Sequence, residues 1–252
     1  MPKCFIFSDC HGFYDELKTA LDEAGFDPNN QEHWLIGAGD YTDRGRQPKQ
    51  VIDYLDSIER KILVKGNHES LIIQCLKRKD FYQHDLSNGT AQTIMDLAPL
   101  AWDFERACET AYPTVKKFIY GMVDYVELKH HIIVHSFIPL INKDGLPVHY
   151  TENRKFAKMK NWRNASAQKW DEARWGNPYE LSAQGFLPEK TLIFGHWNTS
   201  WARAYFDGDV MYGPNANHDI YYGDGFIGID AMTAYSHKVN VLVLEDEFTE
   251  EM

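Results

Sequence analysis

The chain has 252 residues, of which 44% are hydrophobic and 25% are charged, a composition typical of soluble globular proteins. Its formal net charge of −11 argues against general affinity for nucleic acid or for an anionic membrane surface. No apolar run approaches the roughly 20 residues that span a bilayer, and the opening MPKCFIFSDCHG lacks the features of a signal peptide. The four cysteines form no CxxC pair, which fits reduced thiols. We therefore expect a cytoplasmic protein without nucleic-acid or membrane partners.

The first part of the chain alternates between strand and helix patterns. Short apolar runs predict three strands, and amphipathic runs with apolar residues on one face predict three helices. The predicted strands are 3–7, 33–37 and 61–66, and the predicted helices are 14–24, 48–60 and 69–79. This β-α-β-α-β-α order predicts parallel strands joined by right-handed crossovers.

Residues 80–122 differ from the segments on either side. They lack β-rich runs and contain breakers at Asn88-Gly89, Pro99 and Pro113. We interpret them as a helical insertion, interrupted at those positions.

Later strand patterns lie close together with few helices between them, which predicts a second, more antiparallel sheet. These patterns cover 123–128, 131–137, 190–196, 225–230 and 238–245. Residues 151–201 hold five of the seven tryptophans and predict a helical layer packed by aromatic rings. Residues 206–225 are rich in Gly, Asn, Asp and Tyr and predict a long surface loop or hairpin that could border an active site. We expect one domain over residues 1–252.

Ligand-type side chains follow five of the predicted strands, at the point where each strand ends. The groups are Asp9 with His11, Asp40 with Asp43 and Arg44, Asn67 with His68, His135 alone, and His196 alone. Each has a structural explanation when taken singly, such as a helix cap, a turn, a core histidine or a surface ion pair. Because open α/β sheets gather their sites at the carboxyl ends of strands, we expect all five loops to meet at one site.

The chemistry of this set favours transition metals. Carboxylate, amide and imidazole ligands without thiolate suit Mn, Fe or Zn better than an all-oxygen Mg or Ca site. One carboxylate can bridge two cations about 3.5–4 Å apart, and such a pair activates a shared water for in-line displacement. An adjacent arginine fits a phosphoryl group.

The ordered motifs D-x-H-G, G-D-x-x-D-R-G and G-N-H-E, followed by isolated H and G-H, resemble the calcineurin-like metallophosphoesterases. The D-R-G and G-N-H-E forms resemble the phosphoprotein phosphatase branch, which includes serine/threonine phosphatases and symmetrical diadenosine tetraphosphatases. The resemblance implies an α/β fold, a four-layer αββα sandwich of the metallo-dependent phosphatase type with a helical insertion. It also implies two divalent transition-metal ions as cofactors, with Mn preferred and Fe or Zn as alternatives.

The same resemblance implies a role for each motif residue. Asp9, His11 and Asp40 would hold the first metal, and Asp40, Asn67, His135 and His196 the second. Arg44, together with Asn67, would bind the substrate phosphate. His68 would be the general acid, oriented by Asp43, and Asp230 would support the site without binding metal.

Some positions depart from the pattern of this branch. The branch places a second phosphate-binding arginine after a tryptophan that resembles Trp175, and none lies between Trp175 and Gly195. Arg163, Arg174 and Arg203 are candidate replacements. Asn198 stands where the wider superfamily often has a second histidine, and could contact a metal.

The expected partner is a phosphorylated substrate, either a phosphoprotein or a small phosphate ester or anhydride. Because the second arginine is missing, we favour hydrolysis of phosphate monoesters by a metal-activated water, as in a serine/threonine protein phosphatase. The alternative is a symmetrical diadenosine tetraphosphate hydrolase, whose compact polyanionic substrate would benefit from a second basic group. A non-catalytic binding module is the third interpretation, and the complete ligand set argues against it.

Overall fold

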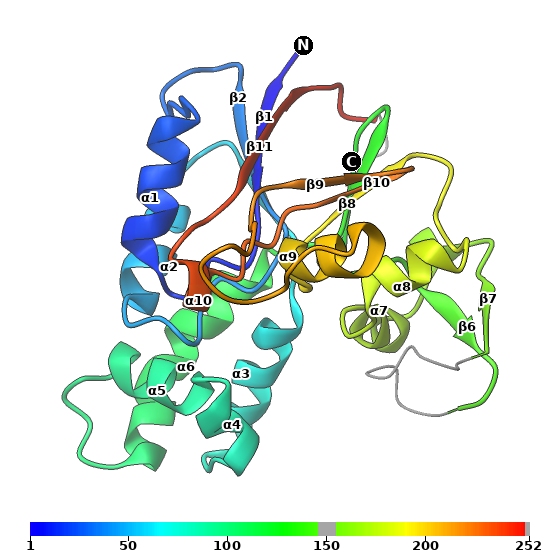
Figure 1. Ribbon diagram of the computed structural model, residues 1–252. Helices are drawn as coiled ribbons and strands as arrows, with labels where there is room; N and C mark the ends of the chain where they lie inside the picture. Colours follow the sequence, from blue (N-terminus) through cyan, green and yellow to red (C-terminus); the bar gives the residue numbers. More distant parts are fainter. Residues whose placement is uncertain (146–154, 250–252) are drawn as a thin grey trace.

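A computed structural model describes residues 1–145 and 155–249 (Figure 1). Two β-sheets lie face to face, and helices cover the outer side of each sheet. This arrangement confirms the predicted four-layer αββα sandwich.

The first sheet has the strand order β11-β1-β2-β3. β1 (Lys3–Phe7), β2 (His33–Gly37) and β3 (Lys61–Leu63) run parallel, as predicted. β11 (Val241–Glu245) pairs antiparallel with β1 along its whole length. The expectation that this last strand joins the second sheet is therefore wrong. β11 instead pairs with the free edge of β1 and becomes an edge strand of the first sheet.

The second sheet has the order β4-β5-β8-β10-β9. Its strands are β4 (Val126–Glu127), β5 (His131–Ile133), β8 (Thr191–Phe194), β10 (Phe226–Gly228) and β9 (Tyr221–Gly223). The three central strands run parallel and only the two edge strands are antiparallel, so the predicted antiparallel character is wrong for the centre. Helices in the connection between β5 and β8 form the crossover that a parallel pair needs.

After its first residue, β1 is buried on both faces, as is the second half of β2, which explains the continuous apolar runs in these two strands. Cys4 and Ile6 of β1 pack between the sheets, together with Ile133 and Ile193 of the second sheet. Phe5 and Phe7 point the opposite way and pack under α1 (Tyr14–Glu23) and α2 (Pro48–Ser57). The alternation along β1 therefore separates two cores.

Helices α7 (Ala167–Ala173) and α8 (Pro178–Ala183) cover the second sheet with Trp170 and Tyr179, and Trp162, which precedes α7, packs with them, as predicted for the tryptophan-rich segment. Residues 151–154 of that segment lie outside the described part of the chain. The remaining short elements are β6 (Leu140–Asn142), β7 (Phe156–Lys158), η1 (Trp162–Asn164), α9 (Thr199–Ala202), η2 (Arg203–Asp207) and α10 (Thr233–Ser236). Between η2 and β9, the predicted surface loop is a turn-rich segment.

The helical insertion packs around a core of its own beside α3 (Asn67–Arg78). It contains α4 (Gln83–Ser87), α5 (Thr90–Leu97) and α6 (Phe104–Tyr120). The predicted breaks at Asn88-Gly89 and Pro99 are confirmed. The predicted break at Pro113 is wrong, because Pro113 lies inside α6. Buried Ala107, Ala111, Val115 and Phe118 recur along one face of α6, and their packing outweighs the hydrogen bond that proline removes.

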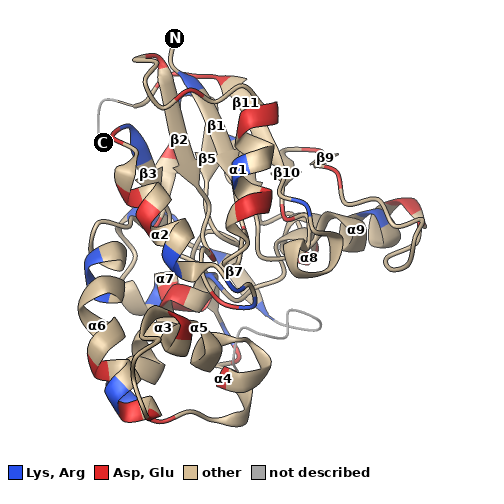
Figure 2. Cartoon of the chain, turned by 90° about the vertical axis from the view of Figure 1, so that its left-hand side faces the viewer, with Lys and Arg blue, Asp and Glu red and all other residues tan. Residues whose placement is uncertain are grey.

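Many of the charged residues lie on helices, whereas most of β1, β2 and β5 is uncharged (Figure 2). Within the two described ranges, no helix is both long enough and apolar enough to cross a membrane.

Candidate metal centre

The predicted ligands come together at the carboxyl ends of strands from both sheets. Asp9 and His11 follow β1, Asp40 follows β2, and Asn67 begins α3 after β3. His135 and His196 follow β5 and β8 of the second sheet. All are buried except His196, which is partly exposed. The site therefore lies where the two sheets bring their loops together.

Asp40 occupies the middle of this cluster. Its Oδ1 lies 3.4 Å from His135 Nε2, and its Oδ2 lies 3.8 Å from both His11 Nε2 and His68 Nε2. Two sets of side chains have ligand atoms within 4.8 Å of one another: His11, Asp40 and His68, and Asp40, His135 and His196. Since Asp40 belongs to both sets, one carboxylate faces two neighbouring cation-sized sites.

Hydrogen bonds fix the neighbouring side chains. His135 Nδ1 lies 2.8 Å from the Ala38 carbonyl oxygen, so the ring donates there and its Nε2 lone pair turns toward Asp40 and Asn67. His11 Nδ1 likewise lies 3.1 Å from the Thr42 carbonyl oxygen. Backbone N–H groups of His196 and His68 donate to Asp9 and Asp40 at 2.9 and 3.0 Å. The imidazoles therefore present the tautomers that suit metal binding.

The backbone of these loops is strained. Six of the nine non-glycine residues with positive φ in the described ranges belong to the candidate site: Asp9, His11, Asp40, Asp43, Arg44 and His196. Two glycines allow the close approach, because a Cβ on Gly66 or Gly195 would lie 2.1 Å from a carboxylate oxygen of Asp40 or Asp9. Strain of this kind is typical of functional sites, where surrounding packing holds unfavourable conformations.

The electrostatics fit bound divalent cations. Burial, with Asp230 and Asp40 nearby, raises the pKa of Asp9 well above its usual value. Burial also lowers the pKa of His11, His135 and His196, which keeps these imidazoles neutral. The buried His11 Nε2 has no hydrogen-bond partner among the described residues. Buried acids beside neutral imidazoles with an unpaired nitrogen form a donor set suited to cations.

His68, Asp43 and Arg44 form a second group beside this cluster. His68 Nδ1 lies 2.7 Å from Asp43 Oδ2, and both side chains are buried. Burial opposes protonation of His68, but the Asp40 and Asp43 carboxylates outweigh it and raise the pKa of His68. Arg44 is exposed, and its guanidinium lies 3.4 Å from His68 Nε2. An imidazole fixed at Nδ1 with its other nitrogen next to an arginine is suited to proton transfer at a phosphoryl group.

Glu69 is a site residue for which the motifs alone predicted no role. Its buried carboxylate accepts backbone N–H groups of Asp40, Tyr41 and Gly66 at 3.0, 3.0 and 2.8 Å. It therefore joins the loop after β2 to the loop after β3. Its position in the G-N-H-E motif indicated that Glu69 lies near the site, but only the folded loops show which groups it contacts.

We predict graded losses when Glu69 is replaced. Glu69→Ala leaves three buried N–H groups without partners and should lower the free energy of unfolding by about 3 kcal/mol or more. Glu69→Gln keeps one acceptor oxygen and should lose less. Urea unfolding of the two variants measures the difference. Equal stability of Glu69→Ala and the parent protein would contradict the role of Glu69 as a clamp.

Asn198, which follows His196 by two residues, has a structural role as a helix cap. Its Oδ1 accepts the Trp201 N–H and the Ser200 hydroxyl, both at 2.8 Å, and so caps α9.

The acidic residue predicted to support the site, Asp230, is buried, and its Oδ1 accepts the Met232 N–H at 2.7 Å. Burial raises the pKa of Asp230 to about 6.

The three candidate replacements for a second arginine are bound elsewhere. Arg163 pairs with Glu127, with 2.7 Å between Nε and Oε2. Arg174 is buried and binds Asp124 together with the Lys65 carbonyl oxygen. Arg203 donates to the Ile220 carbonyl oxygen at 3.1 Å. These contacts occupy the guanidinium groups of Arg163 and Arg174, whereas the buried Nε of Arg203 has no hydrogen-bond partner among the described residues.

Aromatic rings flank the partly exposed His196. The ring centroids of Trp175 and Trp197 lie 6.4 and 6.5 Å from the centroid of the His196 ring. Trp201 continues the row from Trp197 at 5.5 Å, and Tyr205 stacks on Trp201 at 4.7 Å. One side of the site is therefore lined by planar apolar groups.

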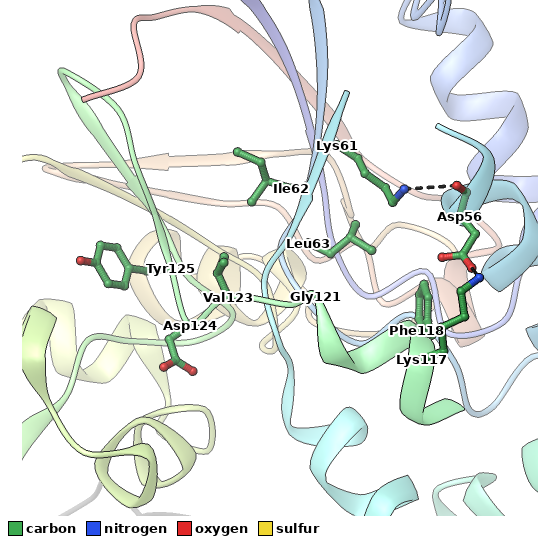
Figure 3. A pocket seen from close by; sticks show the side chains of 10 residues that line it. All are labelled: Asp56, Lys61, Ile62, Leu63, Lys117, Phe118, Gly121, Val123, Asp124 and Tyr125. Carbon is green, nitrogen blue, oxygen red and sulfur yellow. Dashed lines mark hydrogen bonds and ion pairs between the residues drawn. The ribbon is translucent and has the colours of Figure 1, made fainter. Parts of the chain in front are cut away.

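A cavity of about 740 Å³ lies beside β3 at the edge of the first sheet, and none of the candidate ligands lines it (Figure 3). Its two lysines are both engaged. Lys61 donates to the Ile58 carbonyl oxygen at 2.7 Å, and Lys117 pairs with Asp56 at 3.0 Å. We assign no chemistry to this cavity.

Comparison with solved structures shows the same fold in known phosphatases. A crystal structure given the provisional name diadenosine tetraphosphatase matches with a TM-score of 0.55 and 16% identity, covering 97% of this chain and 91% of that one. The cold-active protein-tyrosine phosphatase of a psychrophilic Shewanella species matches with a TM-score of 0.57 and 14% identity, covering 97% and 76%.

Sequence relatives match the chain over a shorter segment. The symmetrical bis(5'-nucleosyl)-tetraphosphatase of Glaesserella parasuis serovar 5 is 35% identical over 74 residues, which is 29% of this chain and 26% of that protein. The enzyme of the same name from Aeromonas salmonicida is 36% identical over 90 residues, 33% and 32% of the two chains. The match thus spans a third or less of these relatives.

The family profile covers far more of the chain. The profile of the calcineurin-like phosphoesterases matches residues 2–222, which include every candidate ligand and the His68–Asp43 pair. Members of this family are metal-dependent hydrolases of phosphate esters, which agrees with the buried donor set described above. The chain therefore belongs to the calcineurin-like phosphoesterase family.

Proposed function

We propose that this protein hydrolyses phosphate esters or anhydrides at a two-metal centre held by Asp9, His11, Asp40, Asn67, His135 and His196. The observation that carries the proposal is the central position of Asp40, whose two oxygens face different imidazoles. Two divalent cations held there would activate a water and neutralise the phosphoryl oxygens. Mn²⁺ is the proposed ion, with Fe or Zn as alternatives, because the donors are mixed oxygen and nitrogen atoms.

The chain's own residues then complete the reaction. Arg44 is exposed beside the centre, so its guanidinium can bind phosphoryl oxygens with two parallel hydrogen bonds. Asn67, through its side-chain amide, would share this contact with the substrate phosphate. His68 would donate the proton at Nε2 to the leaving oxygen, while Asp43 holds Nδ1 and so fixes the orientation of the ring. Burial of His68 and Asp43 keeps this pair in one arrangement.

We propose a dinucleoside tetraphosphate, cleaved symmetrically, as the leading substrate. Two observations support this choice over the phosphoprotein favoured by the sequence alone. Relatives with sequence similarity carry the name symmetrical bis(5'-nucleosyl)-tetraphosphatase. The rings of Trp175 and Trp197 beside His196 offer planar surfaces on which a nucleobase can stack.

A phosphoprotein monoester is the second candidate. The observation that favours it is the engagement of Arg163 and Arg174 elsewhere in the fold. A monoester brings only about two negative charges to the site, so Arg44 and the cations can bind it without another arginine.

Initial rates on the two substrate classes distinguish these candidates. With Mn²⁺ at fixed salt, we expect kcat/KM for diadenosine tetraphosphate to exceed that for phosphoserine and phosphothreonine peptides by about a hundredfold, which corresponds to about 2.7 kcal/mol in the transition state. Chromatography should show ADP as the sole nucleotide product, because symmetrical cleavage gives two identical halves. The reverse preference would establish the monoester candidate. Inactivity on both substrate classes and on p-nitrophenyl phosphate would support a non-catalytic binding module.

We further propose that residues 1–252 form one domain in the cytoplasm. The two sheets share the core between them, which supports a single unit. All four cysteines are buried free thiols, as expected in a reducing compartment.

A further inference from the structure

The N-terminus of α5 packs directly against the turn that carries Asp43 and Arg44. A Cβ placed on Gly89, which precedes α5, would lie 2.5 Å from the Arg44 backbone nitrogen. One turn into the helix, the fully buried Thr93 hydroxyl accepts the Asp43 N–H at 3.0 Å. Asp43 and Arg44 both have positive φ, at 71° and 60°. The insertion therefore supports a strained turn that belongs to the proposed site.

Thr90, the first residue of α5, reaches the acid pair itself. Its hydroxyl donates to Asp43 Oδ2 at 2.6 Å, and this is the same oxygen that lies 2.7 Å from His68 Nδ1. Thr90 and Asp43 are 0% exposed and His68 is 3% exposed. Asp43 Oδ1 has no hydrogen-bond partner among the described residues. One carboxylate oxygen thus holds both a hydroxyl from the insertion and the imidazole from α3.

We propose that Thr90 is a positioning residue for proton donation by His68, supplied to the site by the helical insertion. The inference rests on the proposed acid role of His68. An ionised carboxylate only accepts hydrogen bonds, so the Thr90 hydroxyl and the His68 Nδ1–H both donate to it. Two donors on one oxygen fix the rotation of the Asp43 carboxylate. The fixed carboxylate holds the His68 ring so that its Nε2 faces Arg44, where the phosphoryl group would be bound.

Removal of the hydroxyl tests this role. Thr90→Val keeps the shape of the side chain and leaves Asp43 with one side-chain donor fewer. We expect kcat to fall about tenfold for an alkyl phosphate, consistent with the loss of a hydrogen bond to a charged group. The fall should be much smaller for p-nitrophenyl phosphate, whose leaving group needs little protonation. KM and metal content should stay unchanged, because the phosphate and metal contacts remain.

Two further variants separate positioning from general damage to the fold. Thr90→Ser retains the hydroxyl and should restore most of the alkyl phosphatase activity. Thr110→Val makes the same chemical change at an exposed position of α6 and should leave both rates unchanged. Thr93→Val removes the contact to the Asp43 backbone, so any loss should affect both esters equally. Equal losses on both esters in Thr90→Val, or no rescue by serine, would overturn the inference.

His68→Asn separates failure of this inference from failure of the proposed function. If His68→Asn loses activity on the alkyl phosphate far more than on p-nitrophenyl phosphate and Thr90→Val does not, only the role of Thr90 is wrong. If His68→Asn loses both activities equally, the acid role on which the inference rests is itself wrong. Melting temperatures measured in parallel show which variants remain folded.

Discussion

Asp40→Asn is expected to abolish both metal binding and hydrolysis. The carboxylate lies between two groups of imidazoles, so an amide that is neutral and offers one acceptor oxygen weakens both proposed metal sites together. A loss of about 4 kcal/mol of transition-state stabilisation corresponds to a fall in kcat/KM of roughly a thousandfold. Elemental analysis should give close to two equivalents of Mn²⁺ for the reconstituted parent protein and far less for the variant.

Asp53→Asn is a matched control, because Asp53 is exposed on α2 and pairs with Lys49 in the same helix. It should keep both ions and full activity. Circular dichroism distinguishes loss of metal from loss of fold in Asp40→Asn. If Asp40→Asn retains two equivalents of metal and most of its activity, the bridging role of Asp40 is wrong.

His68→Asn is expected to retain metal and to lose the chemical step. General acid catalysis typically contributes about 10²–10⁴-fold, so kcat on alkyl phosphates should fall by that range. The loss on p-nitrophenyl phosphate should be far smaller. Steady-state rates on the two esters, with metal content measured on the same samples, test both parts of this expectation.

The control for this variant is His84→Asn, which replaces an exposed histidine of α4 and should leave both rates unchanged. Loss of metal in His68→Asn would contradict the separation of roles. That outcome would make His68 a ligand, as its distance of 3.8 Å from Asp40 Oδ2 permits.

Much of the site could be predicted because its residues follow strands in short loops. In parallel strands with right-handed crossovers, the position of Asp9, Asp40 and Asn67 just after a strand is enough to place them at one edge of the sheet. The second sheet extends the same argument to His135 and His196. The position of a residue directly after a strand was therefore enough to predict that these side chains lie close together.

Contacts that depend on packing between distant segments could not be predicted. Thr90 belongs to an insertion whose sequence shows only a helical pattern, and its contact with Asp43 follows from how α5 lies on the turn. The helix containing Pro113 persists because tertiary packing overrides local preference. The prediction that β11 joins the second sheet was wrong for a related reason, because an apolar strand pattern does not specify which sheet edge the strand will join.

The pairing of β11 with β1 has a consequence for biosynthesis. Residues 3–7 leave the ribosome long before their antiparallel partner at 241–245, because nearly the whole described chain lies between the two strands. Until then one edge of β1, the strand that leads to Asp9 and His11, has unpaired backbone groups and can pair with other chains. A nascent chain stalled before residue 241 should therefore be prone to aggregation and should require a chaperone, even though all of its proposed metal ligands have already been synthesised.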